Sequence, residues 1–127
     1  MLKTIFIVGT GGFFGSVARY LTQLLVERYL HSSFPWGTFA ANVAGSFIIG
    51  VVYAMSERGS LLTPEWRMFL AVGFCGGFTT FSSFAYNNLT MLSESNILHF
   101  VGNIGLSLFF GISAVFIGIV TVRAVIG

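Results

Sequence analysis

The sequence predicts an all-α membrane protein with four transmembrane helices. Its 127 residues are 55% hydrophobic and 8% charged, and the mean hydropathy is +0.89. Three long runs contain no charged residue: they lie between Arg28 and Glu57, between Arg67 and Glu94, and between Glu94 and Arg123. Such runs are long enough for helices of about 20 residues that cross a bilayer.

We expect one transmembrane domain over residues 1–127, with helices near residues 4–26, 36–56, 66–90 and 97–122. The first stretch is longer than the hydrophobic core of a signal peptide, and no small-residue cleavage pattern follows it. We therefore expect it to remain in the mature protein.

Polar residues and prolines separate the four stretches. The segment Ser33 to Pro35 can open the second helix, and Thr63 to Glu65 supplies an N-cap, a first-turn proline and a first-turn acid for the third. A polar break from Ser93 to Asn96 precedes the fourth helix. Trp36 and Trp66 stand at predicted helix starts, where an indole anchors at the headgroup level.

The third stretch contains a segment that is hard to keep helical. Residues 73–84 read Gly-Phe-Cys-Gly-Gly-Phe-Thr-Thr-Phe-Ser-Ser-Phe. Glycine weakens a helix by about 1 kcal/mol relative to alanine, and Thr and Ser offer the backbone alternative hydrogen bonds. Within a bilayer, freed backbone is tolerated only where it is buried in protein, lines a wet cavity or binds an ion. We therefore predict a break in the third helix and a functional site there.

The second stretch carries a polar stripe, because Thr38, Asn42 and Gly45 fall on one helix face with Ser46 beside it. Hydrogen bonding between helices, at about 1 kcal/mol for each group, explains Thr38 and Ser46 taken alone. Asn42 is less easily explained in this way, since its two N–H donors could serve an anion as well as a neighbouring helix.

The fourth stretch repeats the pattern with Asn103, Ser107 and Gly111 on one face. Two such stripes facing the broken third helix would make a polar track. Close helix packing is the alternative, because Ser107 and Gly111 also form a small-xxx-small pair. Packing and pore lining are compatible with each other.

Arg19 is the one charge well inside a predicted span. It either snorkels to the interface or faces protein and makes the local potential positive, which would suit an anion. Phe81 and Phe84 lie three residues apart just after the glycines. Packing or lipid contact would explain any one of the phenylalanines, but an aromatic edge also attracts a small anion without trapping it.

The charges outside the helices predict orientation only weakly. With four spans, Lys3, Arg58, Arg67 and Arg123 share one side of the membrane and Arg28 lies on the other. The positive-inside rule would place both termini in the cytoplasm. One Arg more or less would change this orientation.

The residues also bear on the class of protein. There is no Gly-x-Ser-x-Gly motif, no carboxylate pair and no Asp, so we expect no enzyme. A small four-helix proton-coupled antiporter of the multidrug type is the alternative, but it needs a titratable carboxylate within the membrane, and every Glu lies at or near a predicted helix end. A scaffold subunit would explain the glycines without using the predicted break.

Three segments in order resemble the signature blocks of the Fluc (CrcB) fluoride channels. They are residues 11–20, which read GGFFGSVARY, residues 37–46, which read GTFAANVAGS, and residues 73–84. The resemblance covers the whole chain and is weakest in the last helix. It implies a passive fluoride-selective channel of the bacterial inner membrane that exports cytoplasmic fluoride and confers fluoride resistance.

The resemblance further implies a dual-topology homodimer of two antiparallel copies with two fluoride paths. A structural sodium ion at the dimer interface would be held by the main-chain carbonyls of Gly76 and Thr79. The residues that it places on the anion pathway are Asn42, Phe81, Phe84, Thr38, Ser82, Ser83 and Ser107. The chain departs from the family pattern at three positions, with Asn103 where we expect Tyr, Gly111 where we expect Ser and Asn87 where many members carry Glu.

Overall fold

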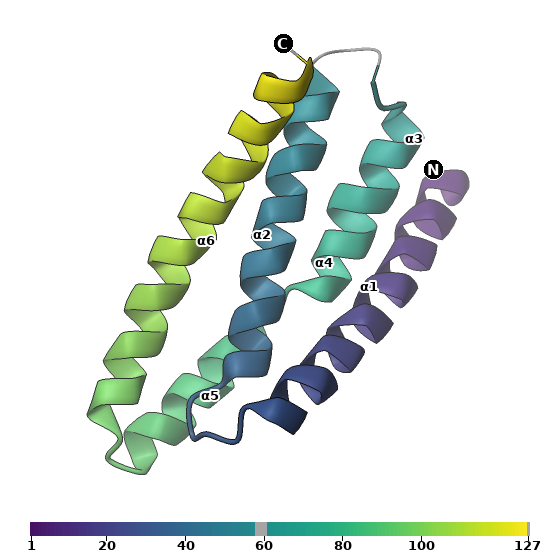
Figure 1. The fold of residues 1–127 in the computed structure, drawn as a ribbon. Coiled ribbons are helices and arrows are strands. Elements are labelled where there is room, and N and C mark those ends of the chain that lie inside the picture. The colour runs from purple at the N-terminus through teal and green to yellow at the C-terminus, as the bar shows by residue number, and fades with distance from the viewer. Residues whose placement is uncertain (58–60, 127) are drawn as a thin grey trace.

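The computed structural model describes residues 1–57 and 61–126, so Arg58, which enters the orientation argument, lies outside the described residues. The chain is all-helical, and four helical spans are long and apolar enough to cross a membrane (Figure 1). These spans are α1 (Leu2–Tyr29), α2 (Trp36–Glu57), the composite third span Pro64–Ser93, and α6 (Ile97–Ile126). The prediction of an all-α protein with four membrane-spanning helices and a bent third helix is confirmed.

The third span consists of several helical segments. Thr63 caps its first turn, α3 (Pro64–Arg67), by accepting a hydrogen bond from the main-chain N–H of Trp66 at 3.2 Å, as the sequence predicts. The chain continues as a π-helix, η1 (Met68–Cys75), and a short segment, α4 (Gly76–Phe78), before α5 (Phe81–Ser93) begins on a displaced axis (Figure 1).

The helix unwinds at Thr79 and Thr80, which follow the glycine pair Gly76 and Gly77 in the chain. Gly76 keeps helical dihedral angles, with φ −61° and ψ −36°, whereas Thr79 and Thr80 are extended, with φ −87°, ψ 156° and φ −148°, ψ 117°. The two threonines therefore unwind the chain. π-helical turns within α-helices are frequent at functional sites.

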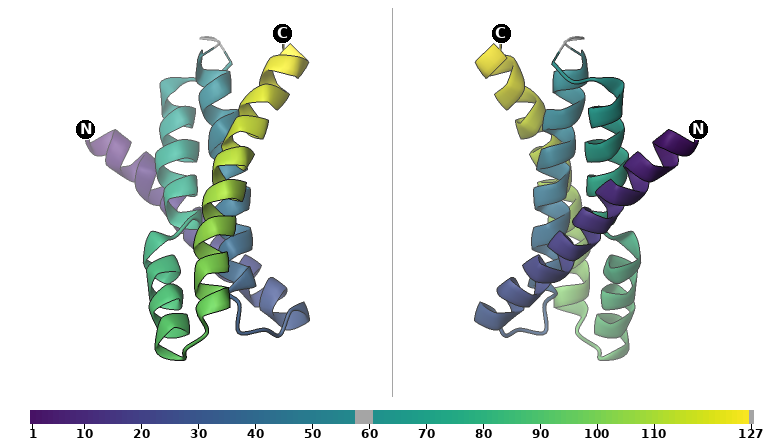
Figure 2. Two further views of the ribbon diagram at one scale, coloured as in Figure 1. Left: turned by 90° about the vertical axis from the view of Figure 1, so that its left-hand side faces the viewer. Right: turned by 90° about the vertical axis from the view of Figure 1, so that its right-hand side faces the viewer.

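Glycines allow α1 to pack closely on η1. A Cβ atom added to Gly15 would clash with the carbonyl oxygen of Phe74, and one added to Gly11 would clash with that of Phe69. The contact between α1 and η1 is the second most extensive in the chain, after that between α2 and α6. α1 crosses the other helices obliquely, and its N-terminus projects away from them (Figure 2).

Much of the apolar surface remains exposed on the single chain. Phenylalanines on α1, α5 and α6 are more than half exposed, among them Phe6, Phe13, Phe81 and Phe109. Soluble monomers rarely expose so much contiguous apolar area, and lipid or another subunit covers such surfaces in membrane proteins. Both termini lie at one end, and the turns α1–α2 and α5–α6 lie at the other (Figure 1).

Candidate functional site

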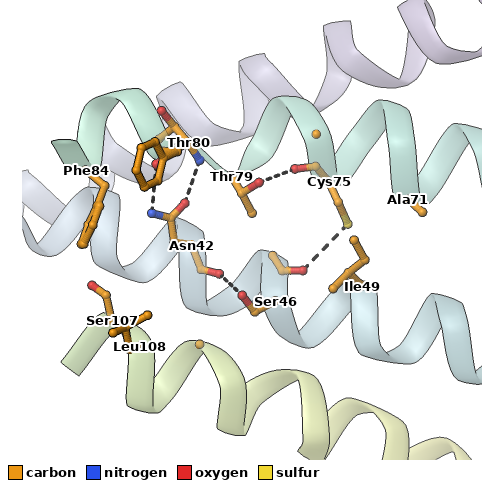
Figure 3. A pocket seen from close by; sticks show the side chains of 14 residues that line it. Asn42, Ser46, Ile49, Ala71, Cys75, Thr79, Thr80, Phe84, Ser107 and Leu108 are labelled. Atoms are coloured by element: carbon orange, nitrogen blue, oxygen red, sulfur yellow. Dashed lines mark hydrogen bonds between the residues drawn. The ribbon is translucent and has the colours of Figure 1, made fainter. Parts of the chain in front are cut away.

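A groove of about 420 Å³ lies between α2, η1, α5 and α6 at the level of the break. Figure 3 shows Asn42 and Ser46 of α2 on one side, Thr79 and Thr80 of the break above them, and Ser107 of α6 near Phe84. Nine residues singled out from the sequence line this groove together: Asn42, Gly45, Ser46, Gly76, Thr79, Phe81, Phe84, Ser107 and Gly111.

Asn42 holds the unwound segment in place. Its Oδ1 accepts a hydrogen bond from the main-chain N–H of Thr80 at 2.7 Å, and its Nδ2 donates to the Thr80 carbonyl at 3.2 Å (Figure 3). The amide thus gives the Thr80 N–H a partner in place of its lost helical one, and it also binds the Thr80 carbonyl, which starts the hydrogen bonding of α5. One of its two Nδ2 hydrogens remains available for another acceptor.

Thr80 is the site residue that the sequence reasoning missed. It caps α5, because its Oγ1 accepts a hydrogen bond from the main-chain N–H of Ser83 at 3.1 Å. The available signal was a threonine directly before a helical stretch, which is a typical N-cap. Ser82 lies beside this cap, with its Oγ 3.3 Å from the Thr80 hydroxyl.

Two carbonyl groups lose their helical partners at the break. In a continuous α-helix the Thr80 N–H would donate to Gly76 and the Ser83 N–H to Thr79. Both donors are engaged elsewhere, with the Asn42 side chain and the Thr80 hydroxyl. Gly76 and Thr79 both line the groove. Their carbonyl oxygens are therefore neutral acceptors without their helical partners, a kind of oxygen that could contribute to binding a hard, singly charged cation.

Side chains of the usual metal ligands do not gather in the part of the chain that is described. Within residues 1–57 and 61–126, no group of three His, Cys, Asp or Glu side chains is placed to hold a metal ion. The candidate cation donors at the groove are the main-chain oxygens of the break.

Arg19 supports the break from α1. Its Nε donates a hydrogen bond to the Gly77 carbonyl at 3.0 Å, which a continuous helix would pair with the N–H of Phe81. The side chain is half-buried. Of the two alternatives left open by the sequence, the structure has Arg19 facing protein, where its charge raises the electrostatic potential behind the break.

Phe81 and Phe84 form the aromatic part of the groove. Their ring centroids are 5.9 Å apart and their planes make an angle of 42°. Phe81 is 78% exposed on the single chain, whereas Phe84 is half-buried. The first turn of α5 presents both rings, because Thr80 starts that helix immediately before them.

Thr38 does not line the groove and instead joins three helices. It is 6% exposed, and its Oγ1 accepts hydrogen bonds from Nε2 of Gln23 on α1 and Nδ2 of Asn87 on α5, each at 3.2 Å. This is the arrangement that interhelical hydrogen bonding predicts. Asn87, which stands where many family members carry Glu, thus donates to Thr38 from an uncharged amide.

Of the three residues in the predicted polar stripe on the fourth helix, only two line the groove. Ser107 and Gly111 line the groove, but Asn103 is 1% exposed and points toward α5. A Cβ atom on Gly111 would meet only the Ser46 Oγ, at 3.8 Å, so the missing serine of the family pattern leaves open space there.

Comparison with known proteins decides the family. The profile described as "CrcB-like protein, Camphor Resistance (CrcB)" matches residues 6–119, a range that contains every residue lining the groove. The chain belongs to the CrcB family. The CrcB relatives include proteins named "Fluoride-specific ion channel FluC" from three bacteria, to which this chain is similar over nearly its whole length.

The relative from Leptospira interrogans is 48% identical over 92% of both chains. The relative from Flavobacterium psychrophilum is 39% identical over 96% of this chain and 98% of its own length. That from Campylobacter jejuni is 42% identical over 93% of this chain and 96% of its own. Membership of the CrcB family agrees with a non-enzymatic transport protein and gives no support to the antiporter alternative.

Proposed function

We propose that this chain is a passive, fluoride-selective ion channel that exports fluoride from the cytoplasm across the bacterial inner membrane. The observation that carries the proposal is the groove at the helix break, in a chain up to 48% identical to proteins named fluoride-specific ion channels. Hydrogen fluoride crosses bilayers as a neutral acid and ionises in the more alkaline cytoplasm, where fluoride is trapped. A channel that lets the anion leave confers resistance.

A passive path is sufficient for export. An inside-negative potential favours exit of an anion by about 2.3 kcal/mol per 100 mV. Proton coupling would need a carboxylate within the span, but the four acidic residues stand at or near helix ends: Glu27, Glu57, Glu65 and Glu94.

The groove offers fluoride donors without a full positive charge. The aromatic edges of Phe81 and Phe84 and the unused Nδ2 hydrogen of Asn42 would replace part of the ion's water shell. Three further residues that the resemblance assigns to the pathway do not line the groove, and they would contact the ion only farther along its path: Thr38, Ser82 and Ser83. Fluoride is small and a strong acceptor, so larger halides should fit such a narrow track poorly.

A second, antiparallel copy of this chain would close the groove. The groove is open on the single chain, and Phe81 at its edge is 78% exposed. Four helices scarcely enclose a lined path by themselves, whereas two inverted copies would provide two equivalent paths.

Sodium would bind at the centre of that dimer. Each copy supplies the carbonyl oxygens of Gly76 and Thr79, so two copies would surround the ion with four neutral oxygens. A divalent ion normally recruits carboxylates, which this segment does not contain.

The direct test is anion efflux from liposomes that contain the purified protein. Fluoride should leave down its gradient without a proton gradient, and chloride should be retained. Chloride efflux at a comparable rate would remove the selectivity proposal. An absolute requirement for a proton gradient would instead favour an antiporter.

A further inference from the structure

Three polar side chains form a hydrogen-bonded chain from the interior to the groove. Nδ2 of Asn103 on α6 donates to Oδ1 of Asn88 on α5 at 3.0 Å, and the Ser107 Oγ donates to Oδ1 of Asn103 at 3.2 Å. Asn103 is 1% exposed and Asn88 is 7% exposed. Ser107 is the member that reaches the groove.

The direction of these bonds decides what Ser107 offers to the groove. A serine hydroxyl has one hydrogen and two lone pairs. In the arrangement described, the hydrogen is directed to Asn103, so the oxygen can present only lone pairs to the groove. Lone pairs repel an anion, whereas a hydrogen-bond donor stabilises it.

The same two contacts are possible in the opposite direction. The oxygen and nitrogen of a carboxamide are close in size, so turning both amides by a half-turn keeps the contacts but exchanges donors and acceptors. Nδ2 of Asn88 would then donate to Asn103, and Nδ2 of Asn103 to the Ser107 Oγ. The Ser107 hydrogen would be free to point into the groove.

We propose that Asn88 and Asn103 are positioning residues that set the hydrogen-bond direction of Ser107, and that the pair reverses when an anion enters. The inference rests on the proposed function, because the anion supplies the acceptor that stabilises the reversed state. Neither amide contacts the ion. Burial of both amides leaves each mainly the other and Ser107 as partners, so the two orientations are coupled.

A double-mutant cycle in liposome efflux tests whether the amides act through Ser107. Asn88→Leu removes donor and acceptor at similar volume, and we expect fluoride efflux to fall about tenfold, which corresponds to about 1.4 kcal/mol of barrier height. Ser107→Ala should lower efflux to a similar extent. The double variant should be no slower than Ser107→Ala alone. Thr90→Val on the same helix, whose hydroxyl donates only to the Tyr86 carbonyl, is the control and should match the wild type.

Wild-type efflux by Asn88→Leu would overturn the inference, as would a double variant in which the two defects multiply. Because Asn88→Leu could fail to assemble, a second measurement uses the unmodified protein: the side-chain amide ¹⁵N signals of Asn88 and Asn103 should shift on addition of fluoride and stay unchanged in Ser107→Ala. Unshifted signals under saturating fluoride would refute the reversal. Absence of wild-type fluoride efflux would instead refute the proposed function, and this inference with it.

Discussion

At the scale of one residue, the side-chain amide of Asn42, within a membrane span, stabilises the break in the third span. It pairs with both main-chain groups of Thr80, at 2.7 and 3.2 Å. An unsatisfied buried polar group costs about 1–3 kcal/mol, so these two bonds make the unwound conformation tolerable. The same side chain stands in the groove with one hydrogen unused, which lets a structural residue also contact an ion.

The aromatic rings give the sharpest prediction at this scale. Replacing Phe81 or Phe84 by Ile keeps apolar bulk but removes the positive ring edge. Fluoride efflux should fall about fivefold or more, since loss of about 1 kcal/mol of anion stabilisation changes a rate by that factor. Efflux from liposomes, normalised to the amount of dimer, is the measurement. Unchanged efflux in both variants would assign the rings to packing.

At the scale of elements, the contact of α1 with η1 holds the broken span in place. Gly11 and Gly15 of α1 bring the main chains together, and Gly73 of η1 meets Gly11 from the other side. Arg19 on the same helix then reaches the Gly77 carbonyl at 3.0 Å. The helix that carries no groove residue thereby supports the one that breaks.

Gly15→Ala should therefore destabilise the protein by about 1–3 kcal/mol, as overpacking does. Its Cβ would clash with the main-chain oxygen of Phe74, a backbone atom and not the flexible end of a side chain. Gly9→Ala is the matched control on the same helix, because a Cβ there has no neighbour within 4 Å. Thermal unfolding in detergent measures both variants. Equal melting temperatures for the two would contradict the close-packing argument.

At the scale of the whole molecule, charge and shape are compatible with insertion in both orientations. Lys3 lies near the start of α1, Arg67 ends α3 and Arg123 lies in the last turn of α6, whereas Arg28 lies in the last turn of α1. Arg123 is 3.6 Å from Glu57. Few basic residues flank the spans, so the positive-inside rule sets the orientation only weakly.

We predict an antiparallel dimer on these grounds. A single terminal tag should be accessible from both sides of the membrane, and cross-linking should yield dimers. A tag that is reached from one side only would exclude dual topology, whatever the efflux activity of the preparation.

Removal of sodium tests the centre of that dimer. Exchange into a large organic cation should weaken the dimer or abolish efflux without altering halide preference, because the ion would bind the carbonyls of the break and not the anion path. Dimer content by size-exclusion chromatography and efflux should change together. Full activity and full dimer stability after rigorous exchange would show that the released carbonyls need no cation.

Part of the site was predictable from local chemistry. Thr and Ser in an apolar run offer the backbone alternative partners, so a break near residues 73–84 follows from residue types. Residue types alone do not show that Gly76 stays helical while Thr79 and Thr80 are extended. Thr80 became a site residue only through Asn42, which is 38 residues away in the chain.

By itself, the sequence determined the membrane class, the four spans and the bend, since these depend on hydropathy, length and local backbone preference. Only the tertiary structure decided which polar groups meet one another. Asn103 shares a helical face with Ser107, yet it is buried against Asn88 while Ser107 lines the groove. Thr38 shares a face with Asn42, yet it bonds Gln23 and Asn87. Periodicity places residues on a face, but the angle at which helices pack decides how deep each residue lies and which partner it finds.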